Sequence, residues 1–186
     1  MMGRRLLLVI GLLIMVNAVP VNCAYAQNQF GYKSFSISTG YPRVKYTDEY
    51  ILRDGVITHK YYVNDVYQNT TTYRCNPNVE GQDVLEVFTG IRKTKEMFHI
   101  LKNISYEDGE SNATFQIKKG MECCEEAIKA YKTGGCESRS SDLEDMYEKL
   151  EKIRKSVYFN DLIRDLKDLL RKYRSLDTEM PCGYVY

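Results

Sequence analysis

The chain has 186 residues, and its 26 Lys and Arg residues nearly balance its 25 Asp and Glu residues, which gives a formal net charge of +1. No basic tract or basic face stands out, so binding to nucleic acid or to an anionic membrane has no electrostatic basis. The length suits a single domain.

The first 26 residues have the pattern of a cleaved signal peptide. Arg4 and Arg5 precede an almost unbroken apolar run from Leu6 to Val16. This run is shorter than the roughly 20 residues of a membrane-spanning helix, and a basic start before a short apolar run is typical of a secretory signal. Small residues just before Gln27 favour cleavage there. We therefore expect residues 27–186 to form one secreted, extracellular domain without a membrane span.

The segment from Ser34 to Arg74 predicts a meander of about four antiparallel strands. It is rich in Tyr, Val, Ile and Thr, and its apolar residues alternate with polar ones. Asp54-Gly55 lies between two apolar runs and indicates a tight hairpin turn, because both turn positions must accept a positive φ. Asn64-Asp65 marks another turn. The last strand then runs from Val66 to Arg74.

Helical periodicity replaces this alternation from Gln82 to Lys102, where apolar residues recur at intervals of three and four. Between Ile104 and Ile117, two short β-like runs on either side of Glu107–Glu110 predict a second hairpin. A short helix is expected from Gly120 to Tyr131, ended by the two glycines that follow.

The most regular helical pattern begins at Ser141 or Asp142 and reaches about Ser175. Its apolar stripe changes phase near Phe159, which predicts a kink or two separate helices. Pro181 is expected to end regular structure. A sheet followed by helices, without β-α-β alternation, predicts an α+β fold in which an N-terminal antiparallel meander packs against C-terminal helices.

The cysteines of a secreted chain are expected to form disulfides that staple the fold. Five follow the expected cleavage site: Cys75, Cys123, Cys124, Cys136 and Cys182. Their connectivity stays open, and the odd number leaves one thiol over unless earlier cleavage retains Cys23. That thiol would be free or would bridge to another chain, for example in a disulfide-linked homodimer.

Three Asn-x-Ser/Thr sequons, at Asn69, Asn103 and Asn112, predict N-linked glycans on the surface of the secreted chain. No catalytic, cofactor or metal site is predicted. The only two histidines, His59 and His99, are far apart, and the cysteines lack Cys-x-x-Cys spacing. Carboxylate pairs such as those around Glu125 lie among lysines at helical spacing, which favours solvated helix faces.

Tyrosine is unusually frequent, with sixteen residues and no tryptophan. Tyr suits a half-wet sheet face, and it also offers contact area at low entropy cost, which suits a binding surface. The candidates for such a surface crowd the predicted strands: Tyr46, Tyr50, Tyr61, Tyr62, Tyr67 and Tyr73.

We therefore expect a secreted glycoprotein that binds another extracellular protein, as a ligand, an inhibitor or a host-directed effector. This function predicts a filled core and an exposed apolar or aromatic patch. One alternative is a carrier of a small apolar or amine ligand, which predicts an enclosed apolar pocket. A second alternative is a hydrolase, which predicts that His59 or His99 meets a carboxylate in a cleft.

Overall fold

The computed structural model describes residues 33–41, 44–74, 83–181 and 184–185 of the chain. The expected signal peptide, Cys75 and Cys182 lie outside these residues. The fold is α+β, as the sequence predicts: an antiparallel sheet comes first and helices follow.

Four strands form the predicted meander. They are β1 (Lys33–Tyr41), β2 (Val44–Arg53), β3 (Val56–Val63) and β4 (Val66–Arg74). A short fifth strand, β5 (Tyr184–Val185), pairs with β4 at Tyr73 and Arg74, so the spatial order is β1-β2-β3-β4-β5. The prediction that regular structure ends at Pro181 is therefore wrong, because the outer side of β4 accepts two further residues of the chain.

Both predicted turns close the hairpins as expected. Asp54 and Gly55 have φ values of 51° and 73°, and Asn64 and Asp65 have φ values of 50° and 64°. Positive φ at both central residues matches the right-handed twist of the strands, and these residue types tolerate it. The turns fix the register of the strands. In the pairing of β3 with β4, the register shifts at a bulge between Tyr61 and Tyr62.

The first long helix, α1 (Val84–Lys102), confirms the prediction of a helix over this stretch. Asp83 caps it, since its Oδ1 accepts hydrogen bonds from the backbone N–H groups of Leu85, at 2.9 Å, and Glu86, at 3.3 Å.

The second hairpin expected between Ile104 and Ile117 is absent. This segment forms a 3-10 turn, η2 (Tyr106–Asp108), and the first turns of a long helix, α2 (Gly109–Thr133). A reciprocal capping box between Ser105 and Asp108 starts the turn. The short helix expected from Gly120 is therefore the second half of α2, which buries Ala113, Ile117, Met121 and further residues at helical spacing.

The last helical region is divided near Phe159, as predicted. It consists of α3 (Glu137–Arg154), α4 (Phe159–Lys172) and the short α5 (Arg174–Thr178). The first of these begins before the expected caps at Ser141 and Asp142, because the backbone N–H of Ser140 already bonds back to the carbonyl of Cys136.

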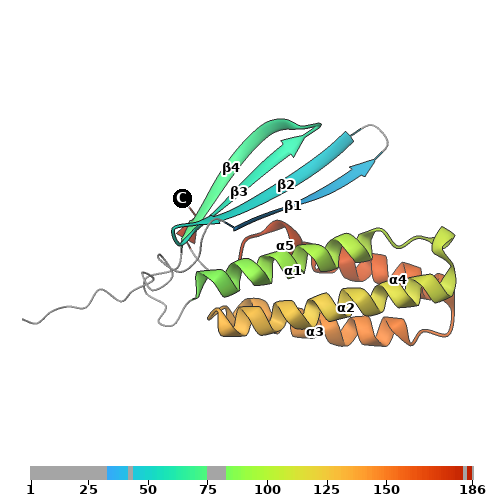
Figure 1. The fold of residues 1–186 in the computed structure, drawn as a ribbon. Helices are drawn as coiled ribbons and strands as arrows, with labels where there is room; N and C mark the ends of the chain where they lie inside the picture. Colours follow the sequence, from blue (N-terminus) through green and yellow to red (C-terminus); the bar gives the residue numbers. More distant parts are fainter. Residues whose placement is uncertain (1–32, 42–43, 75–82, 182–183, 186) are drawn as a thin grey trace, which may run out of the picture.

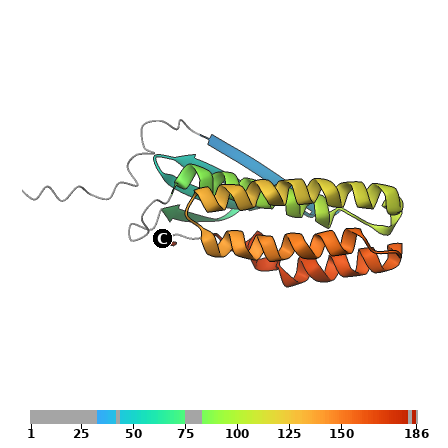
Figure 2. The same cartoon turned by 90° about the horizontal axis from the view of Figure 1, so that it is seen from below.

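The sheet lies on one side of the helices (Figure 1). Helix α1 is nearest the strands, and α2 and α3 lie beyond it. Seen from below, α4 runs beside α3 (Figure 2). The end of the sheet that carries the β2–β3 turn meets α1, whereas the end that carries the β3–β4 turn rises away from the helices (Figure 1).

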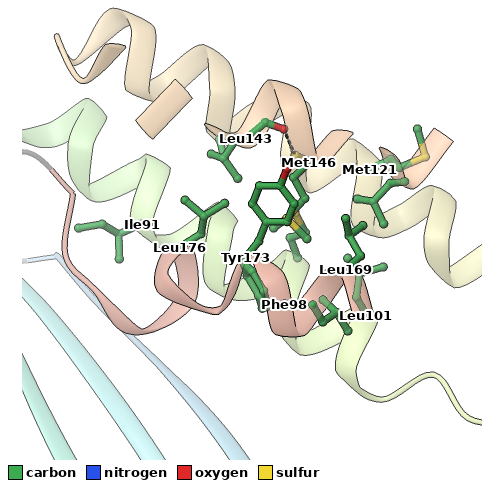
Figure 3. Packing of buried hydrophobic residues seen from close by; sticks show 14 of the residues in the cluster. Ile91, Phe98, Leu101, Met121, Leu143, Met146, Leu169, Tyr173 and Leu176 are labelled. Atoms are coloured by element: carbon green, nitrogen blue, oxygen red, sulfur yellow. Dashed lines mark hydrogen bonds between the residues drawn. The ribbon is translucent and has the colours of Figure 1, made fainter. Parts of the chain in front are cut away.

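Side chains from all the helices fill the core between them. Figure 3 shows Leu143 and Met146 of α3 and Met121 of α2 beside Phe98 of α1 and Tyr173, all of them buried. The sheet adds Leu52 and Ile57, each 2% exposed, at the end that meets α1. The described part of the chain thus has one continuous apolar core.

Candidate functional site

The six candidate tyrosines fall into two groups. Tyr50 is only 2% exposed, and its ring stacks on Phe35 at 4.9 Å and on His59 at 4.4 Å between centroids. Burial, together with the charge of Asp48, raises the pKa of Tyr50 far above its usual value. Tyr73 packs against the same core. These two rings lie at the end of the sheet that α1 covers, so they belong to the core and not to a binding surface.

The other four tyrosines gather at the opposite end. We call this end the sheet tip and define it as residues 44–47, 61–63 and 66–67. Tyr46 and Tyr61 share a face with the buried Tyr50, yet both remain half-exposed because the sheet rises away from the helices here (Figure 1). Tyr62 and Tyr67 lie on the opposite face, which points away from the helices.

Ring contacts and hydrogen bonds fix these side chains on both faces. The rings of Tyr46 and Tyr61 stack at 6.3 Å with an angle of 9°, and those of Tyr62 and Tyr67 meet edge to face at 6.0 Å. The Tyr62 hydroxyl donates to Glu49 Oε2 at 3.0 Å, and this hydrogen bond raises the pKa of Tyr62. The phenol therefore stays neutral and anchored.

The most exposed part of the sheet tip is apolar and aromatic. Val66 is 61% exposed and Tyr67 is 54% exposed, side by side after the β3–β4 turn. An ion pair between Lys45 Nζ and Asp65 Oδ1, at 2.9 Å, borders them. The sheet tip thus combines large rings with a charged rim, an arrangement common in protein interfaces.

A polar pair separates the sheet tip from the core. His59 Nε2 lies 2.6 Å from Asp48 Oδ1, and both side chains are largely buried. Burial alone would raise the pKa of Asp48, but the hydrogen bond from His59 and the positive charges of Lys95 and Lys102 lower it below its usual value. The aspartate therefore stays ionised inside the sheet–helix junction.

A second group of charges lies on the helices. Asp177 of α5 forms ion pairs with two lysines of α1: Lys95 Nζ lies 3.3 Å from its Oδ1, and Lys102 Nζ lies 2.5 Å from its Oδ2. Sequence spacing does not predict this network, because Asp177 is distant in the chain from both lysines. One signal was present in the sequence. Asp48 is two residues before Tyr50 in a strand, so its carboxylate lies on the same face of the sheet as the buried Tyr50 ring.

The histidines meet the hydrolase prediction only in part. His59 does contact a carboxylate, but among the described residues none of its hydrogen bonds reaches a hydroxyl or thiol that it could activate. His99 lies near the end of α1, where its Nε2 is 3.4 Å from Asn103 Nδ2, and its buried Nδ1 has no hydrogen-bond partner among the described residues. The described side chains therefore assemble no nucleophile and base.

The cysteines differ from the expectation at two positions. Cys123 and Cys124 are free thiols, and no disulfide joins two cysteines of the described segments. Cys124 is 0% exposed in the core, where its Sγ donates to the Leu143 carbonyl at 3.5 Å, and burial raises its pKa to about 12. Cys123 is half-buried, with its pKa raised by burial and by Glu96. Cys124 thus lies between α2 and α3, whereas Cys123 lines a groove beside β1.

All three sequon asparagines are exposed. Asn69 lies in β4 directly opposite Tyr61, Asn103 follows the last residue of α1, and Asn112 lies in the first turn of α2. These positions leave room for a glycan at each.

Three of the open grooves on the described surface lie between neighbouring elements. One, of about 450 Å³, runs between β1 and α1, a second, of about 670 Å³, runs between α2 and α3, and a third, of about 320 Å³, runs between α3 and α4. Charged residues line much of the second, including Glu125, Glu144 and Lys132. None of the three has the enclosed apolar shape that a carrier predicts.

Within the described ranges, no group of three or more His, Cys, Asp or Glu side chains is placed to hold a metal ion. No helix there combines the length and the apolar composition that a membrane crossing requires. The chain matches no protein-family model, no curated protein and no solved structure.

Proposed function

We propose that this protein is secreted and acts by binding another extracellular protein through the sheet tip. The observation that carries the proposal is the gathering of four tyrosines, two on each face, beside the exposed Val66 at an end of the sheet that the helices do not cover.

The chemistry of the sheet tip suits a protein partner. Tyr side chains bury large areas with few rotatable bonds, and they are frequent among residues that dominate binding energy. At the sheet tip their rings are already held by stacking and by hydrogen bonds, for example between Tyr67 Oη and Thr70 Oγ1 at 2.9 Å. Little side-chain entropy is therefore lost on binding.

The covalent features of the secreted chain belong to the same proposal. Glycans are expected at Asn69, Asn103 and Asn112, whose side chains are exposed. A disulfide is expected from Cys136 to Cys75 or Cys182, which would staple the helices to the strands or to the end of the chain. Support comes from Cys136 itself, which is buried and is not among the free thiols.

Binding is favoured over the two alternatives on particular grounds. A carrier would need an enclosed apolar pocket, whereas the described grooves are open and partly charged. A hydrolase would need a nucleophile within reach of His59, whose contacts are with Asp48 and the ring of Tyr50.

The test is a binding screen of the secreted, glycosylated chain against an array of purified extracellular domains. Any domain that binds is retested with Tyr67→Ala and with Tyr62→Ala, whose rings lie on the face opposite to that of Asn69. Loss of a dominant interface tyrosine costs about 2 kcal/mol, so at least one variant should weaken binding by more than tenfold.

Tyr158 provides the matched control. It is 70% exposed in the connection between α3 and α4, far from the sheet tip in sequence, and Tyr158→Ala should leave binding unchanged. Binding lost in Tyr158→Ala and kept in both sheet-tip variants would reject the sheet tip as the interface. Hydrolysis of an ester or peptide substrate that Asp48→Asn abolishes would favour an enzyme instead.

A further inference from the structure

Among the described residues, no strand pairs with the outer edge of β1. The N–H and the carbonyl of Lys45 both point toward β3, since they bond the Asn64 side chain at 2.8 Å and the Asn64 backbone N–H at 2.7 Å. The direction in which backbone groups point alternates from one residue to the next along a strand, so the even-numbered residues of β2 point toward β1. Asp48 and Tyr50 therefore form backbone hydrogen bonds with their partners in β1, which are Ile37 and Phe35. The N–H and carbonyl groups of Ser34, Ser36 and Ser38 therefore point outward.

Residues 34–38 of this edge have none of the charges, prolines and bulges that often protect an edge strand from pairing. From Ser34 to Ser38 it carries no charge and no proline, and its register with β2 is continuous. The opposite edge differs, because β4 is partly covered by β5, carries the sequon at Asn69 and pairs with β3 across a bulge. Exposed, regular, uncharged edges are those that pair with another strand.

The edge is also complementary to itself. The sequence Ser34-Phe35-Ser36-Ile37-Ser38 is nearly symmetric about Ser36. In an antiparallel pair with its two-fold axis at Ser36, Ser34 faces Ser38 of the second copy and Phe35 faces Ile37. In each pair of facing serines, the backbone groups of both residues point toward the other copy. The two residues of such a pair exchange two N–H···O=C hydrogen bonds.

An open groove lies beside this edge, between β1 and the helices. The groove of about 450 Å³ is lined by Ser36, Ile37 and Ser38 on one side and by Glu96, His99, Ile100 and Cys123 on the other. A neighbouring strand would lie about 4.8 Å from β1, at the mouth of this groove. Its apolar side chains would extend the face on which Phe35 and Ile37 lie.

We infer that the protein forms a symmetric homodimer in which the β1 edges of two copies pair antiparallel about Ser36. A two-fold axis makes such an interface use the same patch on both copies. This dimer needs no cysteine, so it persists in reductant, in contrast to the disulfide-linked dimer that an odd cysteine would form.

The first experiment measures mass in solution, by sedimentation velocity on the secreted chain in reductant over a range of concentrations. The mass should rise to that of two chains. Ser36→Pro removes an outward N–H without removing a bond to β2, and it should shift the dimer–monomer midpoint by more than tenfold in concentration. Thr72→Pro is the matched control on the outer side of β4, and it should not shift the midpoint. A monomer at every concentration, or a dimer that Ser36→Pro leaves intact, would overturn the proposal.

The second experiment tests the register and does not depend on proline being tolerated. In a Cys123→Ser background, Ser36→Cys places two thiols across the axis at a Cα separation of about 5.5 Å, which a disulfide spans. Ser38→Cys places them roughly 14 Å apart, beyond its reach. Mild oxidation should crosslink the first variant and not the second. Equal crosslinking of both, or crosslinking of Ser38→Cys alone, would reject the pairing about Ser36.

Alkylation of Cys123 in the unmutated chain should also be slower in the dimer, because the second copy covers its groove.

Discussion

The ring of Tyr131 on α2 lies where a side chain on Gly90 of α1 would lie. A Cβ atom built on Gly90 would come within 2.7 Å of Tyr131 Cε1, and Tyr131 is fully buried. The glycine that weakens the helical pattern of α1 is therefore the residue that lets α1 and α2 approach each other.

Gly90→Ala should destabilise the protein by up to about 2 kcal/mol. The better helix propensity of alanine contributes about 1 kcal/mol, but overpacking against a buried ring costs typically 1–3 kcal/mol. Chemical denaturation measures the free energy of unfolding, with Thr89→Ala at the neighbouring, half-exposed position as the control. A net gain in stability would show that Tyr131 moves aside freely.

Asp48→Asn should lower stability at pH 7 by about 1–3 kcal/mol, since it weakens a hydrogen bond to an ionised carboxylate in the sheet–helix junction. The pKa of Asp48 is lower in the folded protein than in the unfolded chain, where an aspartate has a pKa of about 3.9. The stabilisation is therefore complete above that pH and is lost as the pH falls through the folded-state pKa.

Unfolding measured between pH 7 and pH 2 should accordingly show the two proteins converging at the acidic end. Asp65→Asn is the control, because that exposed carboxylate pairs with Lys45 at the surface and contributes little. A constant difference at every pH would mean that the charge of Asp48 is not what stabilises the junction.

The two groups of tyrosines should respond differently to truncation. Tyr50→Ala leaves a cavity under the sheet and should cost about 3–5 kcal/mol, as large aromatic truncations in cores do. Tyr67→Ala removes a half-exposed ring and should cost less than about 1 kcal/mol. Thermal unfolding of both variants is sufficient to compare them, and equal losses would contradict the division into core and sheet tip.

The adjacent cysteines should differ in reactivity. In the folded protein, iodoacetamide should modify Cys123, which lines the groove beside β1, and should spare Cys124, whose thiol is buried and has a pKa of about 12. Peptide mapping by mass spectrometry before and after denaturation distinguishes the two sites. Rapid modification of Cys124 in the folded state would indicate that α2 and α3 separate at Leu143.

Local signals in the sequence are sufficient to predict most of the sheet. Turns such as Asp54-Gly55 require residues that tolerate positive φ, so these positions are visible without any knowledge of the helices. The segment at the start of α2 has the composition of strands, because Ile104, Thr114, Phe115 and Ile117 are β-branched or aromatic. There the capping box of Ser105 and Asp108 and the helical spacing of buried residues outweigh intrinsic preference.

The candidate site could be predicted only in outline. Composition drew attention to six tyrosines, but whether a ring is buried depends on where α1 crosses the sheet, which is a tertiary relation. The same holds for Asp177, which reaches Lys95 and Lys102 from α5. Sequence spacing does not encode such distances.

The pairing of β5 with β4 also affects how the chain completes its fold. The meander can form from neighbouring segments with little loop closure, whereas Tyr184 and Val185 reach Tyr73 and Arg74 only after every helix has been made. This contact therefore has the longest sequence separation in the described sheet. We expect it to form late in folding and to open first under load or heat, ahead of the β-hairpins.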